Sequence, residues 1–165
     1  AIALGATTIA PAFATTPAAA ATSQIQAQDV LQHYSSLVYA NYSDSIAAAK
    51  QMQQAIDAFI ANPSQATQDA ARKAWLNARE FYGQTEAFRF YDGPIDNEDG
   101  PEGQINAWPM DESYVDYVVG DEKAGLINNR SEAITKERLA ELNEHDGEEN
   151  ISTGWHAIEF MLWGL

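Results

Sequence analysis

The stretch "AIDAFIANPSQATQDAARKAW", residues 55–75, decides the fold because it holds the end of one long helical pattern and the start of another. Before it, apolar residues recur at steps of three and four over residues 30–60, with no Gly or Pro until Asn62-Pro63. Ser64 is a favoured N-cap, and it opens a second helical pattern over residues 65–91. Two long helices joined by so short a turn form an antiparallel hairpin. We therefore predict an all-α helical bundle built on this hairpin.

The rest of the chain alternates turn signals with short apolar patterns. Residues 92–131 contain "DGPEG" and "WP" and are predicted to form an ordered irregular region with a short helix near 111–119. A further helix is predicted over 134–142. The last helix is predicted to begin near Asn150 or Ser152 and to be still apolar at Leu165, with no cap or glycine stop, which suggests that the chain is cut there.

Composition indicates one acidic domain. The chain has 165 residues, 45% of them hydrophobic, and a formal net charge of −15. Between residues 92 and 150, 17 acidic residues stand against four basic ones. Such a field repels phosphate backbones and anionic lipid surfaces and concentrates cations, so we expect no nucleic-acid partner. The simpler interpretation of the same charge is that it only keeps the protein soluble.

The absence of cysteine and the uncharged N-terminal segment together predict an exported protein without thiol chemistry. Cysteine is absent, which excludes disulfides and cysteine-ligated metals, so any metal must use nitrogen or oxygen ligands. Residues 1–14 are uncharged and end in Ala-Phe-Ala, typical of the remnant of a secretory signal peptide. Residues 15–27 are predicted to be a flexible leader and residues 28–165 the helical domain. We expect a periplasmic or cell-envelope location and no membrane span.

His156 and Glu159 are the candidate metal ligands. Three residues apart on a helix, they share a face and can point at one ion. An imidazole nitrogen and a carboxylate oxygen suit zinc or iron. Two ligands alone are too few, and a buried histidine paired with a buried glutamate is the competing interpretation of the same spacing.

The second helix carries a candidate polar network. Three charged residues are predicted to share one helical arc with large aromatic residues: Trp75, Arg79, Tyr82, Glu86, Arg89 and Phe90. If that face is buried, the charged residues form a costly network that faces a ligand or borders the His156–Glu159 pair. If it is exposed, they are ordinary surface ion pairs. Buried Trp75 and Tyr82 would favour the first reading.

The motifs together resemble the imelysin family of bacterial envelope proteins. Residues 154–159, "GWHAIE", form a GxHxxE motif followed by "FMLWG". The stretches "NYSDSIAAAKQMQQAIDAFIANPS", "ARKAWLNAREFYGQTEAFRFYDGPID" and "GPEGQINAWPMDESYVDYV" are similar to the N-terminal half of that family. The resemblance covers about residues 28–165. It implies an all-helical fold of two bundle-like halves with a site where they meet, and we expect this chain to be the first half, truncated at residue 165.

The resemblance favours a metal at His156 and Glu159, with Arg79, Tyr82, Glu86 and Arg89 facing the ligand or bordering the metal. Members of the family were named for a proposed insulin-cleaving metallopeptidase activity, and others are iron-regulated envelope proteins or parts of ferrous-iron uptake systems. A zinc peptidase needs three protein ligands and a general base, and only two ligands are identified here. We therefore expect a protein that binds a divalent metal, iron or zinc, in iron acquisition, with other envelope iron-uptake components as partners. A zinc metallopeptidase is the alternative, and a structural envelope protein comes third.

Overall fold

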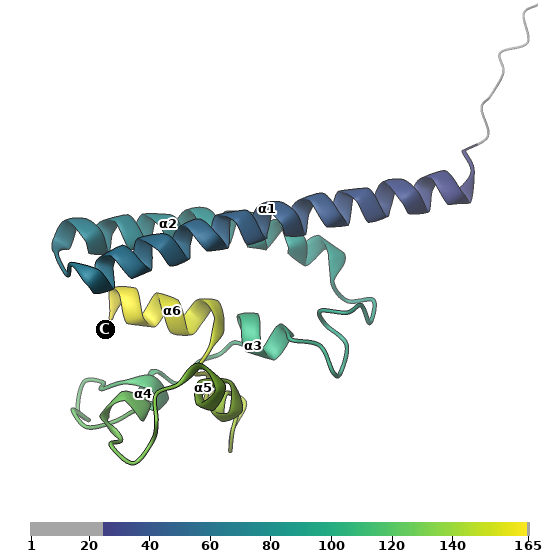
Figure 1. Ribbon diagram of the computed structural model, residues 1–165. Coiled ribbons are helices and arrows are strands. Elements are labelled where there is room, and N and C mark those ends of the chain that lie inside the picture. Colours follow the sequence, from purple (N-terminus) through teal and green to yellow (C-terminus); the bar gives the residue numbers. More distant parts are fainter. Residues whose placement is uncertain (1–24, 165) are drawn as a thin grey trace, which may run out of the picture.

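The computed structural model describes residues 25–164, and every regular element among them is helical, which confirms the all-α prediction (Figure 1). The elements are α1 (Ala27–Ala61), α2 (Gln65–Thr85), the 3-10 turn η1 (Glu86–Phe88), α3 (Glu102–Asn106), α4 (Glu112–Val115), the 3-10 turn η2 (Leu126–Asn128), α5 (Lys136–Leu142) and α6 (Gly154–Trp163). The predicted signal peptide and most of the predicted leader lie outside the described residues.

Helices α1 and α2 form the predicted antiparallel hairpin. The turn is closed by a capping box at Ser64, whose side chain accepts a hydrogen bond from the Thr67 backbone at 3.2 Å. The Thr67 hydroxyl in turn accepts one from the Ser64 N–H at 3.1 Å. The cap satisfies backbone donors that the first turn of a helix otherwise leaves unpaired, and it fixes where α2 begins.

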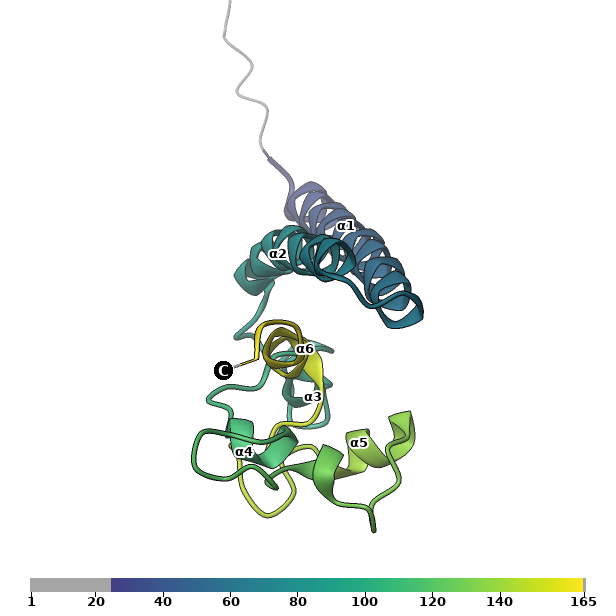
Figure 2. The ribbon, with the colours of Figure 1, turned by 90° about the vertical axis from the view of Figure 1, so that its left-hand side faces the viewer.

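The hairpin is the upper of the layers visible in Figure 2, with α6 and α3 beneath it and α4 and α5 farther below. The main core lies where α6 packs under α1 and α2. Its buried members are Ala48, Met52, Ala71, Trp75, Ala78, Tyr82, Trp155 and Leu162. A smaller cluster of Met110, Val115, Ile151 and Ala157 joins α6 to the irregular region below. Helix α6 therefore has neighbours on two sides, so its orientation is fixed by packing.

The N-terminal part of α1 extends beyond α2 (Figure 1). The residues that α1 buries begin at Ser45, whereas Leu31 and Leu37 are exposed although they belong to the same apolar pattern. Periodicity predicted the helix correctly, but it does not reveal which part of the helix has a neighbour.

Helix α2 ends earlier than predicted. It stops at Thr85 and tightens into η1, and the chain then turns away at Phe90, which has a φ of 71° and is 87% exposed. The carboxylate of Asp96 accepts hydrogen bonds from the backbone N–H groups of Phe90 and Gly93 and so stabilises this turn. The prediction that Phe90 shares the helical face of Trp75 was wrong for this reason.

The predicted last helix was wrong at both ends. Helix α6 begins at Gly154 because the preceding residues are held extended by hydrogen bonds to Asn143. It ends at Trp163, where Gly164 takes a φ of 67° and donates its N–H to the Phe160 carbonyl at 2.7 Å. Gly164 therefore is the glycine stop that the sequence analysis missed.

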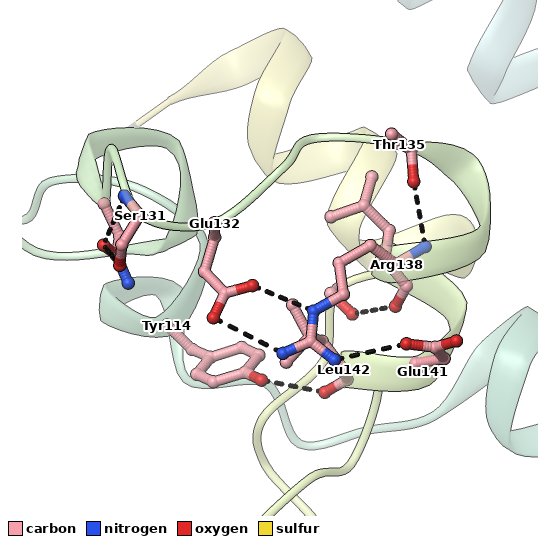
Figure 3. A network of polar contacts seen from close by, with 10 residues as sticks. Tyr114, Ser131, Glu132, Thr135, Arg138, Glu141 and Leu142 are labelled. Atoms are coloured by element: carbon pink, nitrogen blue, oxygen red, sulfur yellow. Dashed lines mark hydrogen bonds and ion pairs between the residues drawn. The ribbon is translucent and has the colours of Figure 1, made fainter.

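The irregular region is ordered, as predicted, but its helices are shorter. Helix α4 covers only part of the predicted 111–119 segment, and α5 starts at Lys136 behind the N-cap Thr135. Figure 3 shows how Arg138 of α5 holds the preceding loop: its guanidinium bonds both oxygens of Glu132, at 2.8 and 3.4 Å. In the same view Tyr114 donates its hydroxyl hydrogen to the Leu142 carbonyl at 2.8 Å. These contacts tie α4, the loop and α5 into one unit.

No helix among residues 25–164 combines the length and the apolar character that crossing a bilayer requires.

Candidate functional site

Gly154 lets the start of α6 lie directly against the end of α3. Its φ is +86°, and a Cβ atom placed there would stand 2.4 Å from the Ile105 carbonyl oxygen. The neighbouring Thr153 hydroxyl donates to the Gln104 carbonyl at 2.9 Å. Only glycine combines this backbone conformation with this approach, which explains the first residue of the GxHxxE motif.

Asn143 fixes the same junction from α5. The side chain is 8% exposed. Its amide donates to the Gly103 carbonyl at 2.8 Å, and its oxygen accepts from the N–H groups of Ser152 and Thr153 at 3.0 and 3.2 Å. One buried side chain thus joins α3, α5 and the entry to α6.

Helix α2 holds the other side and the far end of α6. The Trp75 indole N–H donates to the Trp155 carbonyl at 3.0 Å, and the Tyr82 and Trp155 rings pack with centroids 5.3 Å apart. At the C-terminus, Gln68 and Arg72 donate to the Leu162 carbonyl at 3.0 and 2.8 Å. The positive charge of Arg72 is attracted to the negative C-terminal end of the helix dipole, which stabilises this contact. Trp75 and Tyr82 are 6% and 5% exposed, which confirms the prediction that both aromatic side chains of the second helix are buried.

His156 and Glu159 lie side by side on α6. Their Nδ1 and Oε2 atoms are 3.2 Å apart, and their side chains are 17% and 44% exposed. The Trp108 ring packs against the imidazole with centroids 4.6 Å apart. Together with Glu112, these residues line a small open pocket of about 220 Å³. The pair is therefore half-buried beside a polar depression, reachable from solvent on the Glu159 side.

The donor atoms of this pair suit a metal ion. Two ligand atoms bound to one ion at about 2.1 Å each stand about 3.0–3.4 Å apart in octahedral or tetrahedral geometry, and the pair is spaced within that range. Within the segment from residue 25 to residue 164, no three His, Asp or Glu side chains are grouped closely enough to hold a metal. The structure thus presents two adjacent donors of the right kind rather than a complete preformed site.

The charged residues predicted on the second helix lie close together, although Glu86 belongs to η1 and Arg89 follows it. The Arg89 Nη2 and Arg79 Nη1 atoms lie 3.2 and 3.8 Å from the same oxygen of Glu86. Arg89 also pairs with Glu102, which accepts a hydrogen bond from the Tyr82 hydroxyl at 3.3 Å. Glu102 completes the network and was missed by the sequence analysis, because it lies 13 residues beyond Arg89 in the irregular region and no helical spacing links the two.

Burial shapes the ionisation of this network. Burial and the neighbouring Glu102 carboxylate raise the pKa of the Tyr82 hydroxyl far above its ordinary value, so it remains a donor. For Arg89, burial is the largest single effect and works against the charged form, but the interactions with Glu102, Tyr82 and Glu86 together outweigh it, so the pKa is raised. The Arg79 Nη1 and Arg89 Nε atoms are buried without a hydrogen-bond partner. The network holds the end of α2 to α3 through the contacts of Tyr82 and Arg89 with Glu102.

Arg79 and Glu86 of the network line a different pocket from the His156–Glu159 pair. The Arg79 guanidinium lies over the Tyr82 and Trp155 rings, 5.1 and 5.9 Å from their centroids. Trp155 is next to His156 in the chain and has its ring on the network side. The structure therefore joins the two predicted sets of residues through the Trp155 ring and α6, not through a shared cavity.

Comparison with known proteins matches residues 38–165 to the family model described as Imelysin. Among curated proteins, Iron-regulated protein A of Synechococcus elongatus is 35% identical over 127 residues. The alignment covers 77% of this chain and 29% of that relative, so the chain spans less than a third of the length of the relative.

Proposed function

The chain belongs to the imelysin family, and on that premise we propose that it is an exported cell-envelope protein that binds a divalent metal ion through the GxHxxE motif. The observation that carries the proposal is the pair of donor atoms on α6, His156 Nδ1 and Glu159 Oε2, 3.2 Å apart at the edge of a solvent-reachable pocket. A neutral imidazole and a carboxylate are ordinary ligands of zinc and iron.

The proposed setting is iron acquisition or another iron-regulated function of the envelope. The similar protein of Synechococcus elongatus is named as iron-regulated, which supports this setting. The net charge of −15 also raises the local concentration of cations around the chain. Export is proposed from the Ala-Phe-Ala pattern that ends residues 1–14.

The experiment compares His156→Ala and Glu159→Gln with the parent protein by calorimetric titration with Zn²⁺ and anaerobic Fe²⁺, by elemental analysis and by thermal melting. Each variant is expected to lose metal affinity at least about tenfold, because each removes one of two adjacent donors. The melting temperature of metal-free Glu159→Gln should change little, since that side chain is 44% exposed, whereas His156→Ala also removes the contact with the Trp108 ring. The control His145→Ala removes an exposed imidazole elsewhere and should bind metal like the parent.

Two results would contradict the proposal. A parent protein that binds neither ion has no metal site, and variants that retain the parent affinity would show that the motif is a buried polar pair only. The metallopeptidase alternative is tested on the same preparations, because it requires that the metal-loaded parent cleave an unfolded protein substrate and that both variants fail to do so.

A further inference from the structure

The His156–Glu159 pair needs at least one more protein ligand. Catalytic zinc sites use three protein ligands and structural ones four, and two donors leave most of the coordination sphere to water. Since the described part of the chain contains no preformed group of three ligand side chains, the third ligand has to be a side chain that reorients on binding or one supplied from elsewhere.

Glu112 is the side chain placed to do this. It is the first residue of α4 and lines the same pocket of about 220 Å³ as His156 and Glu159. Among the described residues that line this pocket, no other besides that pair carries a carboxylate or an imidazole. A third potential donor, from a different element of the fold, therefore lies on the wall of the same pocket as the pair.

The Glu112 backbone is fixed while its carboxylate is uncommitted. The carbonyl of Glu112 accepts the Asp116 N–H at 3.1 Å, the preceding Asp111 donates its N–H to the Glu149 carbonyl at 2.8 Å, and the Asp111 carboxylate caps the N–H of Ser113 at 2.9 Å. The Glu112 side chain is exposed and has no hydrogen bond or ion pair with the described residues. Rotation about side-chain torsions can thus redirect the carboxylate without moving α4 and without breaking a polar contact.

The resulting ligand set is chemically balanced. One neutral imidazole and two carboxylates neutralise a divalent cation and provide the mixed nitrogen and oxygen donors that zinc and ferrous iron accept. Resting on the proposed function, we propose that Glu112 is the third protein ligand of the metal held by His156 and Glu159, so that the ion links α4 to α6.

The test titrates the intact protein with Co²⁺, a spectroscopic probe for zinc and ferrous sites, and compares Glu112→Gln with Glu122→Gln. The second variant removes the same charge from an exposed glutamate that lines none of the pockets around α6. We expect Glu112→Gln to weaken Co²⁺ binding at least about tenfold and to change the intensity of the visible absorption bands, which report coordination number. Glu122→Gln is expected to match the parent in both, and the melting temperatures of the metal-free variants should agree.

The outcomes separate this inference from the function on which it rests. If the parent binds Co²⁺ and Glu112→Gln binds it with the parent's affinity and spectrum, the third-ligand assignment is overturned while metal binding by the pair stands. Equal weakening in Glu112→Gln and Glu122→Gln also overturns it, because only the general field of the acidic chain would then be acting. A parent that binds no metal overturns both.

Discussion

At the scale of single residues, the GxHxxE glycine is a structural requirement of the site. Gly154 has a φ of +86°, and a methyl group there would meet the Ile105 carbonyl oxygen at 2.4 Å. We predict that Gly154→Ala lowers the free energy of unfolding by at least about 2 kcal/mol, because backbone strain and the close contact with α3 add together. Urea unfolding followed by circular dichroism measures the loss.

Gly120→Ala is the matched control for this change. Gly120 has a similar φ of +93°, but no atom lies within 4 Å of the position that its Cβ would take. Its substitution should cost only the backbone strain, about 1 kcal/mol. Equal losses in the two variants would show that the contact between α6 and α3 contributes nothing, and would contradict the role assigned to Gly154.

Helical spacing predicted which candidate residues lie side by side, but not what surrounds them. His156 and Glu159 could be paired from sequence because helical spacing alone brings them together. Glu102 and Glu112 could not, since each lies in the irregular region and reaches its neighbours only through the folding of that region. The spacing of residues within one helix does not predict which distant loop that helix contacts.

At the scale of elements, helix boundaries were predictable where the signal is local. Ser64 and Thr135 cap α2 and α5 with their own side chains, so the sequence identified the start of α2 correctly and that of α5 within two residues. The end of α2 depends on Asp96 and the start of α6 on Asn143, both distant in sequence from the boundary that they set. Tertiary hydrogen bonds determine those two helix ends, so local sequence signals predicted both of them in the wrong place.

The loop before α5 provides a prediction on pH. Hydrogen bonds from Arg138 lower the pKa of Glu132 below its ordinary 4.5, an effect that outweighs its partial desolvation (Figure 3). A carboxylate with a lowered pKa adds stability that is fully present above its unfolded value and is lost as the pH falls through its folded value. Melting curves of the parent and of Glu132→Gln should therefore differ most above pH 4.5 and converge below it.

The control for this prediction is Glu137→Gln, which removes an exposed α5 carboxylate that makes no ion pair with the described residues. Its melting temperature should not converge on that of the parent in the same way. Convergence of equal size in both variants would mean that acid acts only by reducing the net negative charge of this part of the chain, and the Glu132–Arg138 pair would then have no separate effect.

At the scale of the whole molecule, the hydrophobic pattern predicted the class of fold, whereas the net charge of −15 predicts how the stability of that fold depends on salt and pH. Leu31 and Leu37 belong to the apolar stripe of α1 but are exposed, so an apolar stripe does not by itself determine which helices pack against it. The net charge of −15 needs no structure to be interpreted, because repulsion within an acidic chain acts over the whole surface.

This repulsion predicts that salt stabilises the protein. Raising NaCl from about 0.02 M to about 0.3 M shortens the screening length from about 20 Å to about 6 Å, which weakens repulsion between the many acidic side chains more than it weakens the few close ion pairs. We expect the melting temperature at pH 7 to rise by about 2–5 °C over this range. Repeating the series at about pH 5, closer to the isoelectric point of about 4.3, should shrink the effect because fewer carboxylates are ionised. A melting temperature that falls with salt at pH 7 would mean that the ion pairs outweigh the repulsion, and an equal rise at both pH values would mean that the salt acts through hydrophobic burial instead.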